Sequence, residues 1–214
     1  MATSDSLELN RLDPQKLKQD LIDTGRWIDG NRWCPATSGN LSAWVDSQQF
    51  LITVSGKGKG ELTQDDLMTV DAGGNPVNTS LRPSAETLLH SLIYRRFPQA
   101  RYVFHTHSIY GTLLSRIIWS GEIVFRNYEL QKAFSGIDTH EVELIVPVFG
   151  NSQDMVALAQ EIDARLDQIE LCRAFILAGH GLYTWGSTAK EARRHIEALE
   201  FLLECEYKSM LLLK

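Results

Sequence analysis

The amino-acid sequence predicts a single α/β domain of three layers, in which a mostly antiparallel central sheet lies between helices on both of its faces. Two observations predict this fold class. Short strand-like segments follow one another at hairpin spacing, and segments with the periodicity of amphipathic helices lie among them. No repeat, low-complexity tract or linker divides the 214 residues, a length that suffices for one substantial core. We therefore expect one domain over residues 1–214.

The helices are predicted by their capping residues and their apolar spacing. The first begins at Asp13 and Pro14, an N-cap aspartate followed by a proline at the first helical position, and ends near Gly30. Thr188 and Glu191 have the spacing of a capping box and start a final helix that runs towards Leu213. Further helices are expected from Ser84 to Pro98, from Ser108 for a short distance, over residues 129–134, and from Ser152 to about Ile169.

The strands are predicted from short apolar runs that end at turn residues. They are expected at residues 41–45, 50–54, 67–70, 101–104, 123–125, 142–146, 174–177 and 182–185. Residues 46–49 would join the first two strands as a hairpin. Pro147 would stop the strand that precedes it.

The composition restricts the classes of partner and compartment. A formal net charge of -6 argues against a nucleic-acid partner, which would favour a basic patch. The three cysteines lie far apart and form no C-x-x-C pair, which indicates reduced thiols in a reducing cytosol. The first residues are polar, unlike a secretory signal, and no apolar run approaches the roughly 20 residues of a membrane-spanning helix. We expect a cytoplasmic protein with no membrane partner.

Three histidines are candidate metal ligands. His105 and His107 come at the end of an apolar strand, where alternate side chains point the same way, so both can bind one ion. His180 lies between Gly179 and Gly181, whose backbone freedom can expose the ring. Three imidazoles leave a fourth zinc position open, as in catalytic sites. The alternative is that these residues are polar turn residues. The remaining histidines, His90, His140 and His195, have no partner at ligand spacing and are interpreted as structural or surface residues.

Two glycine-bearing loops are suited to binding an anion. They cover residues 37–40 and 55–60, and their backbone N–H groups can form a concave nest to which lysine adds positive charge. Ser84, at a predicted helix N-terminus, would add a hydroxyl and the helix dipole. Neither loop has the spacing of a Walker A or G-x-G-x-x-G motif, so each could equally be a plain turn.

Two carboxylates could transfer protons. Glu86 lies in the first turn of the Ser84 helix, where it could simply compensate the helix dipole. Glu129 lies 22 positions after His107 (129 − 107), where it could simply be a solvated acid. Beside a metal-bound carbonyl, either carboxylate could instead shuttle a proton from the adjacent carbon.

Five motifs, taken in order, resemble the class II aldolase/adducin-like family. They are S-G-N at 38–40, S-G-K-G-K-G at 55–60, P-S-A-E at 83–86, H-T-H-S at 105–108 and G-H-G at 179–181. The resemblance extends from about Asp13 to Leu213. It implies a largely antiparallel sheet flanked by helices and one zinc ion per subunit. The implied zinc ligands are His105, His107 and His180, and the implied phosphate-binding residues are Asn40, Ser55, Gly56 and Ser84.

Within this family, three stretches are similar to the branch that dehydrates a ketose phosphate in methionine salvage. They are P-S-A-E-T-L-L-H at 83–90, N-Y-E-L-Q-K-A-F-S-G-I at 127–137 and V-P-V-F at 146–149. The similarity implies Glu129 as the base and Glu86 in a supporting role, whereas in aldolases the glutamate that matches Glu86 is the acid/base. Ala85 stands where aldolases often have a second serine, which counts against an aldolase.

The alternatives are another sugar-phosphate aldolase or 4-epimerase with the same metal site, and a non-catalytic adducin-like interaction module. The resemblance, together with the apolar residues 210–213, also implies a homo-oligomer, with a tetramer expected.

Overall fold

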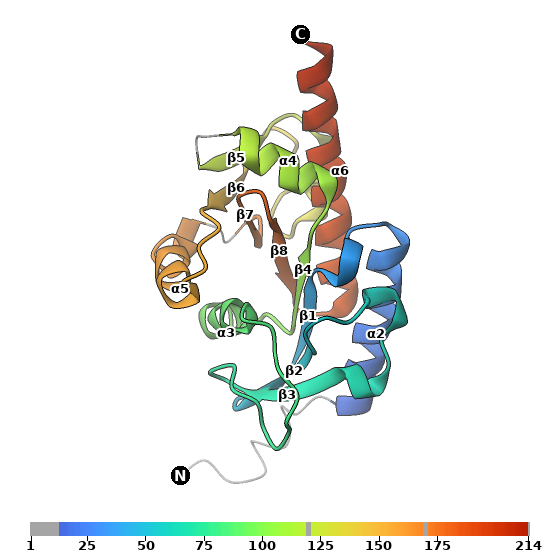
Figure 1. Cartoon of the computed structure of the whole chain (residues 1–214). Helices are drawn as coiled ribbons and strands as arrows, with labels where there is room; N and C mark the ends of the chain where they lie inside the picture. Colours follow the sequence, from blue (N-terminus) through green and yellow to red (C-terminus); the bar gives the residue numbers. More distant parts are fainter. Residues whose placement is uncertain (1–12, 119–120, 169–170, 214) are drawn as a thin grey trace.

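Eight strands form one mixed sheet at the centre of the computed structural model, which describes residues 13–118, 121–168 and 171–213 (Figure 1). The strands are β1 (Asn40–Asp46), β2 (Gln49–Thr53), β3 (Leu67–Asp71), β4 (Tyr102–Thr106), β5 (Glu122–Phe125), β6 (Leu144–Phe149), β7 (Ala174–Leu177) and β8 (Gly181–Gly186). Their order across the sheet is β3-β2-β1-β4-β8-β7-β6-β5. Of these neighbours only β6 and β7 are parallel, which confirms the predicted, mostly antiparallel sheet.

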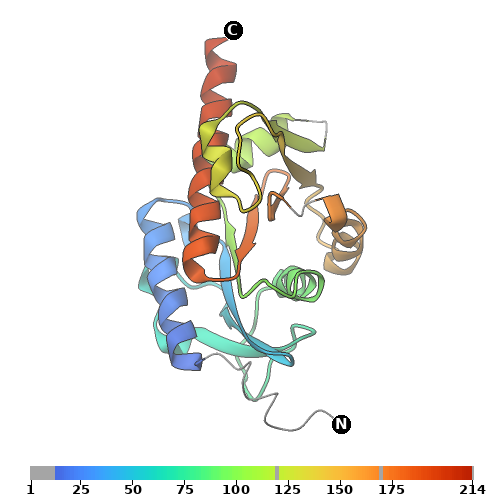
Figure 2. The same ribbon diagram turned by 180° about the vertical axis from the view of Figure 1, so that it is seen from behind.

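Helices cover both faces of this sheet. The α-helices are α2 (Pro14–Gly30), α3 (Thr87–Arg96), α4 (Ile109–Ile117), α5 (Met155–Asp163) and α6 (Ala189–Leu212). Short 3₁₀ segments are η1 (Pro35–Thr37), η2 (Lys59–Glu61), η3 (Gln64–Asp66), η4 (Glu129–Ala133) and η5 (Leu166–Gln168). Helices α2 and α6 lie on one side of the sheet, and α3 and α5 lie on the other (Figures 1 and 2). The predicted three-layer α/β architecture is confirmed.

The alternation of side chains along the strands divides the core between these two faces. Leu41 and Ala43 of β1 pack with Leu17 and Leu21 of α2 in one buried cluster. Residues of β2, β3 and α3 belong to a second, larger cluster that continues through β6, β7 and β8. At about 25 cal/mol per Å² of apolar area, burial on both faces is the main stabilising contribution to such a sheet.

Strand β4 lies in the middle of the sheet, between β1 and β8. Its residue His105 is paired with Asn40 of β1 on one side and with Tyr183 of β8 on the other. The strand is buried along its whole length, so the backbone that carries the first histidine is held from both edges. The histidine end of this strand is therefore a rigid platform.

Several predictions differ from the structure. The helix expected over residues 129–134 is the 3₁₀ segment η4, and the strand expected at 142–146 begins at Leu144. Helix α3 begins at Thr87, because Ser84 accepts a hydrogen bond from the Glu86 N–H in a turn that precedes the helix. Helix α5 begins at Met155, since the Asp154 carboxylate, and not Ser152, caps its first turn; the predicted end at Ile169 lies outside the described residues. Strand β6 continues through Pro147, which is paired with Glu122 of β5.

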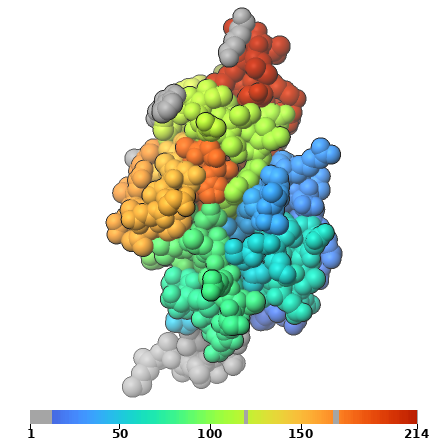
Figure 3. Space-filling view, in the orientation of Figure 1, coloured from blue at the N-terminus to red at the C-terminus, as the bar shows by residue number. Residues whose placement is uncertain are grey.

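The last turns of α6 extend beyond the rest of the molecule, as the red segment at the top of Figures 1 and 3 shows. Leu212 there is 86% exposed, and Leu211 and Leu213 are exposed as well. No helix within the described residues combines the length and the apolar content needed to cross a bilayer. The single-domain boundary of 1–214 stays a prediction, because residues 1–12 lie outside the described part.

Candidate active site

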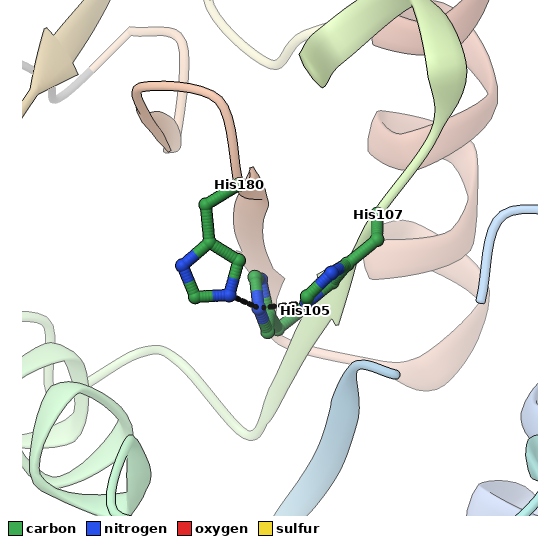
Figure 4. A group of neighbouring side chains, drawn as sticks. All are labelled: His105, His107 and His180. Atoms are coloured by element: carbon green, nitrogen blue, oxygen red, sulfur yellow. Dashed lines mark hydrogen bonds between the residues drawn. The ribbon is translucent and has the colours of Figure 1, made fainter. Parts of the chain in front are cut away.

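The structure brings the three predicted histidine ligands together (Figure 4). His105 lies near the end of β4 and His107 directly follows this strand, whereas His180 comes from the turn between β7 and β8. The His105 Nε2 atom lies 2.8 Å from Nε2 of His107 and 3.4 Å from Nε2 of His180. The ligand atoms of all three lie within 4.8 Å of one another, a spacing that one metal ion can bridge.

The hydrogen bonds of the Nδ1 atoms leave two of these Nε2 atoms free to bind a metal. His105 Nδ1 lies 3.0 Å from the Leu182 carbonyl oxygen, which can only accept, so the His105 N–H is on Nδ1. His180 Nδ1 likewise donates to Asn151 Oδ1 over 3.0 Å. A ring that carries its proton on Nδ1 directs its Nε2 lone pair into the cluster, the arrangement typical of metal-binding histidines.

The environment of His105 and His107 favours their neutral forms. Burial lowers the pKa of His105 well below its usual value and lowers the pKa of His107 to about 4, with the neighbouring imidazoles acting in the same direction. Neutral imidazole is the form that binds a metal. Tyr183 of β8 stacks on the His105 ring, with the centroids 3.9 Å apart, and so limits the rotation of that ring.

Glu86 is the carboxylate that touches this cluster. Its Oε1 atom lies 2.9 Å from His180 Nε2, and its Oε2 atom lies 3.6 Å from His105 Nε2 and accepts a 2.7 Å hydrogen bond from Asn40. Burial opposes ionisation, but the contacts with His180, His105 and Asn40 outweigh it and hold the pKa of Glu86 below its usual range. A carboxylate oxygen and an imidazole nitrogen at 2.9 Å require a proton or a metal ion between them. The donor set therefore suits a cation.

A pocket of about 240 Å³ opens above the histidines. The four residues predicted to bind phosphate, Asn40, Ser55, Gly56 and Ser84, all line it. Gly56 has a φ of +78°, which a side chain would disfavour, so the loop after β2 needs glycine at this position. The other lining residues are Thr37, Ser38, Gly39, Thr53, Val54, Ala85, Glu86, His107, Asn151, Gln153, Met155 and His180.

Lys59, in the second glycine loop, is a residue of this region that the sequence does not single out. Its ammonium is buried and donates to the carbonyl oxygens of Thr37 and Lys57, at 3.1 and 2.6 Å. The ammonium thus bridges one carbonyl oxygen of each glycine loop and places a positive charge next to both loops. Burial lowers the pKa of this ammonium, while the charge of Glu86 raises it. The alternation of lysine and glycine is the only sequence signal for this role.

The side chain of Asn40 is oriented by the Glu86 carboxylate and by His90, and not by the two glycine loops. Its Nδ2 donates to Glu86, and its Oδ1 is in hydrogen-bond contact with His90. His90, for which the sequence predicts a structural or surface position, is completely buried.

The structure does not bring Glu129 to the cluster of His105, His107 and His180. The Glu129 side chain is 75% exposed, forms an ion pair with Lys132 at 2.7 Å and lies 3.6 Å from His140 Nδ1. It borders a separate groove of about 510 Å³ between η4 and α6, and it does not line the histidine pocket. The other residues of this groove, which we call the η4–α6 groove, are Tyr128, Leu130, Ala133, Arg194, Glu197, Ala198 and Phe201.

Comparison with known proteins identifies the family. The family described as "Class II Aldolase and Adducin N-terminal domain" matches residues 19–207. A methylthioribulose-1-phosphate dehydratase of Pseudomonas syringae pv. syringae (strain B728a) is 47% identical over 194 residues, which are 91% of this chain and 95% of that protein. A protein of the same name from Yersinia enterocolitica is 48% identical over 192 residues, or 90% and 91% of the two chains.

Solved structures agree with the fold. L-fuculose-1-phosphate aldolase from Thermus thermophilus superposes with a TM-score of 0.74 at 26% identity, covering 92% of this chain and 96% of that one. YgbL from Klebsiella pneumoniae, described as a putative aldolase/epimerase/decarboxylase, superposes with a TM-score of 0.78 at 23% identity over 92% and 91% of the two chains. The resemblance of the five motifs is confirmed, and the chain belongs to the class II aldolase and adducin family.

Proposed function

We propose that this chain is a methylthioribulose-1-phosphate dehydratase, a lyase that removes water from 5-methylthioribulose 1-phosphate. The product is 2,3-diketo-5-methylthiopentyl 1-phosphate, and the pathway is methionine salvage in the cytoplasm. One observation carries the proposal: in a chain 47% identical with dehydratases of that name, a cluster of three imidazoles lies against a pocket that an ionised carboxylate and two glycine loops line.

The metal that we propose is one Zn²⁺ per chain, held by His105, His107 and His180. Three nitrogen ligands with an open fourth position are the pattern of catalytic zinc. Lewis-acid polarisation of a ketose carbonyl is the chemistry that such an ion supplies when bound.

The phosphate of the substrate is assigned to the two glycine loops. Ser55 and Ser84 offer hydroxyls, the backbone around Gly56 offers N–H groups, and Asn40 lies at the edge of this cradle. The Lys59 ammonium behind the loops adds the favourable charge. Because the phosphate lies at one end of the ketose, its binding orients the C2 carbonyl and the C3–H bond relative to the histidines.

The reaction needs a base at C3 and a route for the C4 hydroxyl to leave. Removal of the C3 proton leaves its electron pair to form an enediolate across C2 and C3. The C4 hydroxyl then takes up the proton that the base removed and leaves as water, which gives an enol that tautomerises to the 2,3-diketone. Glu86 is the carboxylate that its own chain offers in the pocket, where it holds or moves a proton next to His180.

Glu129 stays the proposed base for the C3 proton, and it would then reach the pocket from a neighbouring subunit. The apolar η4–α6 groove beside it, with Phe201 52% exposed, and the exposed end of α6 favour a subunit contact there. We therefore propose a homo-oligomer, with a tetramer expected, in which Glu129 of one chain faces the histidines of another.

An aldolase or a 4-epimerase would start from the same bound ketose phosphate, and the contact between Glu86 and the histidines also suits an aldolase. A non-catalytic module would have no use for three convergent imidazoles.

Product analysis separates these functions. The zinc-loaded protein is incubated with 5-methylthioribulose 1-phosphate, and the diketone is followed by its absorbance while a coupled assay detects free aldehyde. We expect the diketone and no aldehyde, and far slower turnover of the same ketose without its phosphate, because remote binding energy is lost. Aldehyde without diketone would show an aldolase.

A further inference from the structure

A line of buried polar side chains leads from the core to Glu86. Glu86, His90 and Tyr94 are spaced four residues apart at the start of α3 and along it, so they lie on one face of the helix. Asn40 and Ser42 are two apart on β1 and point to the same side of the sheet. His90 and Ser42 have no exposed surface, and Asn40 and Tyr94 have at most 5%.

These five side chains form one continuous hydrogen-bond chain. The Tyr94 hydroxyl lies 2.7 Å from Ser42 Oγ, and Ser42 Oγ lies 2.7 Å from His90 Nδ1. His90 Nε2 is in hydrogen-bond contact with Asn40 Oδ1. Asn40 Nδ2 then donates to Glu86 Oε2 over 2.7 Å.

The direction of every donor in this chain follows from its last member. Asn40 turns its NH₂ group to Glu86 Oε2 and its oxygen to His90. His90 must therefore donate from Nε2. Burial lowers the pKa of His90 to about 3, so the ring is neutral and its Nδ1 can only accept, from Ser42. Ser42 has then used its hydrogen, and Tyr94 donates to it.

We propose that His90 is a positioning residue, which through Asn40 holds the Glu86 carboxylate against the histidine cluster. The role rests on the function proposed above for Glu86. An amide such as that of Asn40 does not pass a proton along readily, so the chain orients the carboxylate and is not a proton wire. With one Glu86 oxygen held by Asn40, the other is directed at His180.

The neighbouring residues favour this role over one in stability alone. Leu89, Leu92 and Ile93 of α3 are buried in the apolar cluster on the same face of the sheet. A buried polar chain among such residues costs desolvation that an apolar side chain of similar volume would avoid. The chain also ends in the candidate active site, whereas the other buried histidine on a helix, His195, bonds only to the Trp185 carbonyl among the described residues.

The first test measures the tautomer of His90 directly. The protein is labelled with ¹⁵N-histidine, and the His90 resonances are assigned by their loss in His90→Gln. We expect a neutral ring with its proton on Nε2, both without metal and after zinc loading. A proton on Nδ1, or on both nitrogens, would overturn the proposed direction of the chain.

The second test is a double-mutant cycle on the zinc-loaded enzyme. His90→Leu should lower kcat roughly 10- to 100-fold, as expected for a misplaced catalytic group, with little change in KM. His90→Gln, whose amide can still donate to Asn40, should recover most of that loss. If His90 acts through Glu86, the double variant His90→Leu/Glu86→Gln should be no slower than Glu86→Gln alone.

His195→Gln is the matched control, because it also removes a completely buried histidine but lies outside the chain. It should lower the thermal midpoint and leave kcat unchanged.

Wild-type kcat in His90→Leu, or multiplicative losses in the double variant, would overturn the proposal. If His90→Leu does not fold, the tautomer measurement and the His90→Gln variant test the proposal instead. We expect His90→Gln to have a kcat close to that of wild type, and a loss of about 10-fold or more would overturn the proposal. If the wild-type protein shows the Nε2 tautomer of His90 but no dehydratase activity, the proposed function is wrong, whereas the proposed direction of the hydrogen-bond chain still holds.

Discussion

At the residue scale, the two candidate glutamates differ in their contacts and in their exposure to solvent. Glu86 contacts two of the three candidate metal-ligand histidines, and its pKa is held below its usual range. Glu129 is exposed, and the Lys132 ammonium beside it lowers its pKa. Glu86 is thus placed to act inside the pocket of its own chain, whereas Glu129 lies on a surface that a second subunit would have to cover.

Substitution of each glutamate by glutamine tests their roles. Glu129→Gln should keep zinc and substrate binding and lose roughly 10²–10⁴-fold in kcat, the range for a general acid–base group. Glu86→Gln should lose less, because the amide can still accept from Asn40. The measurements are steady-state kinetics, with zinc content by elemental analysis. An inactive Glu86→Gln beside an active Glu129→Gln would reverse the two roles.

At the scale of elements, α6 packs against β4 through an unusual contact. Glu200 of α6 is 3% exposed, and its Oε1 atom accepts from the Thr106 hydroxyl over 3.3 Å. Its Oε2 atom has no partner among the described residues. Burial raises the pKa of Glu200 to about 7, so this carboxyl is protonated in the folded state at a pH where it is ionised in the unfolded chain.

Glu200 should therefore make stability depend on pH. Between about pH 4.5 and pH 7 the folded state holds a proton that the unfolded state has lost. The contribution of Glu200 to the free energy of unfolding then falls as pH rises, by at most about 1.4 kcal/mol per pH unit. Glu200→Gln should gain stability relative to wild type as the pH rises from about 4.5 to about 7. Urea denaturation of metal-free protein across this range measures the difference, and a constant difference would contradict it.

At the scale of the whole molecule, the two halves of the proposed site lie in different places on one chain. The histidine pocket is formed by β1, β4, the turn before β8 and the start of α3, whereas Glu129 borders the η4–α6 groove. If the oligomer joins the pocket of one chain to the groove of another, each active site is shared.

Mixing inactive subunits tests this arrangement. His105→Ala/His107→Ala should lose its zinc and its activity, and Glu129→Gln should be nearly inactive on its own. When the two are dissociated and reassembled together, some sites combine an intact histidine cluster with an intact Glu129. We expect activity to return to up to about a quarter of wild type, the statistical fraction if subunits mix freely. Sedimentation should show a tetramer, and a fully active monomer would contradict the shared site.

The sequence by itself determined the fold class, the approximate bounds of the strands, and the three histidines that converge. These are local properties: period-2 alternation predicted that His105 and His107 point the same way at the end of a strand, and the glycines at 179 and 181 marked a turn. The five motifs and their order also sufficed to identify the family over residues 19–207.

Only the tertiary structure decided what surrounds those histidines. The pairing of β1 with β4 brings Asn40 beside His105, although 65 residues separate them (105 − 40). The tertiary structure also places Glu86, at the start of α3, against His180, and places His90 of α3 between Ser42 and Asn40. The sequence spacing likewise did not predict that Glu129 lies away from the histidine pocket of its own chain. Local patterns encode which face of a strand or helix a residue occupies, whereas the order of strands across the sheet decides which faces meet.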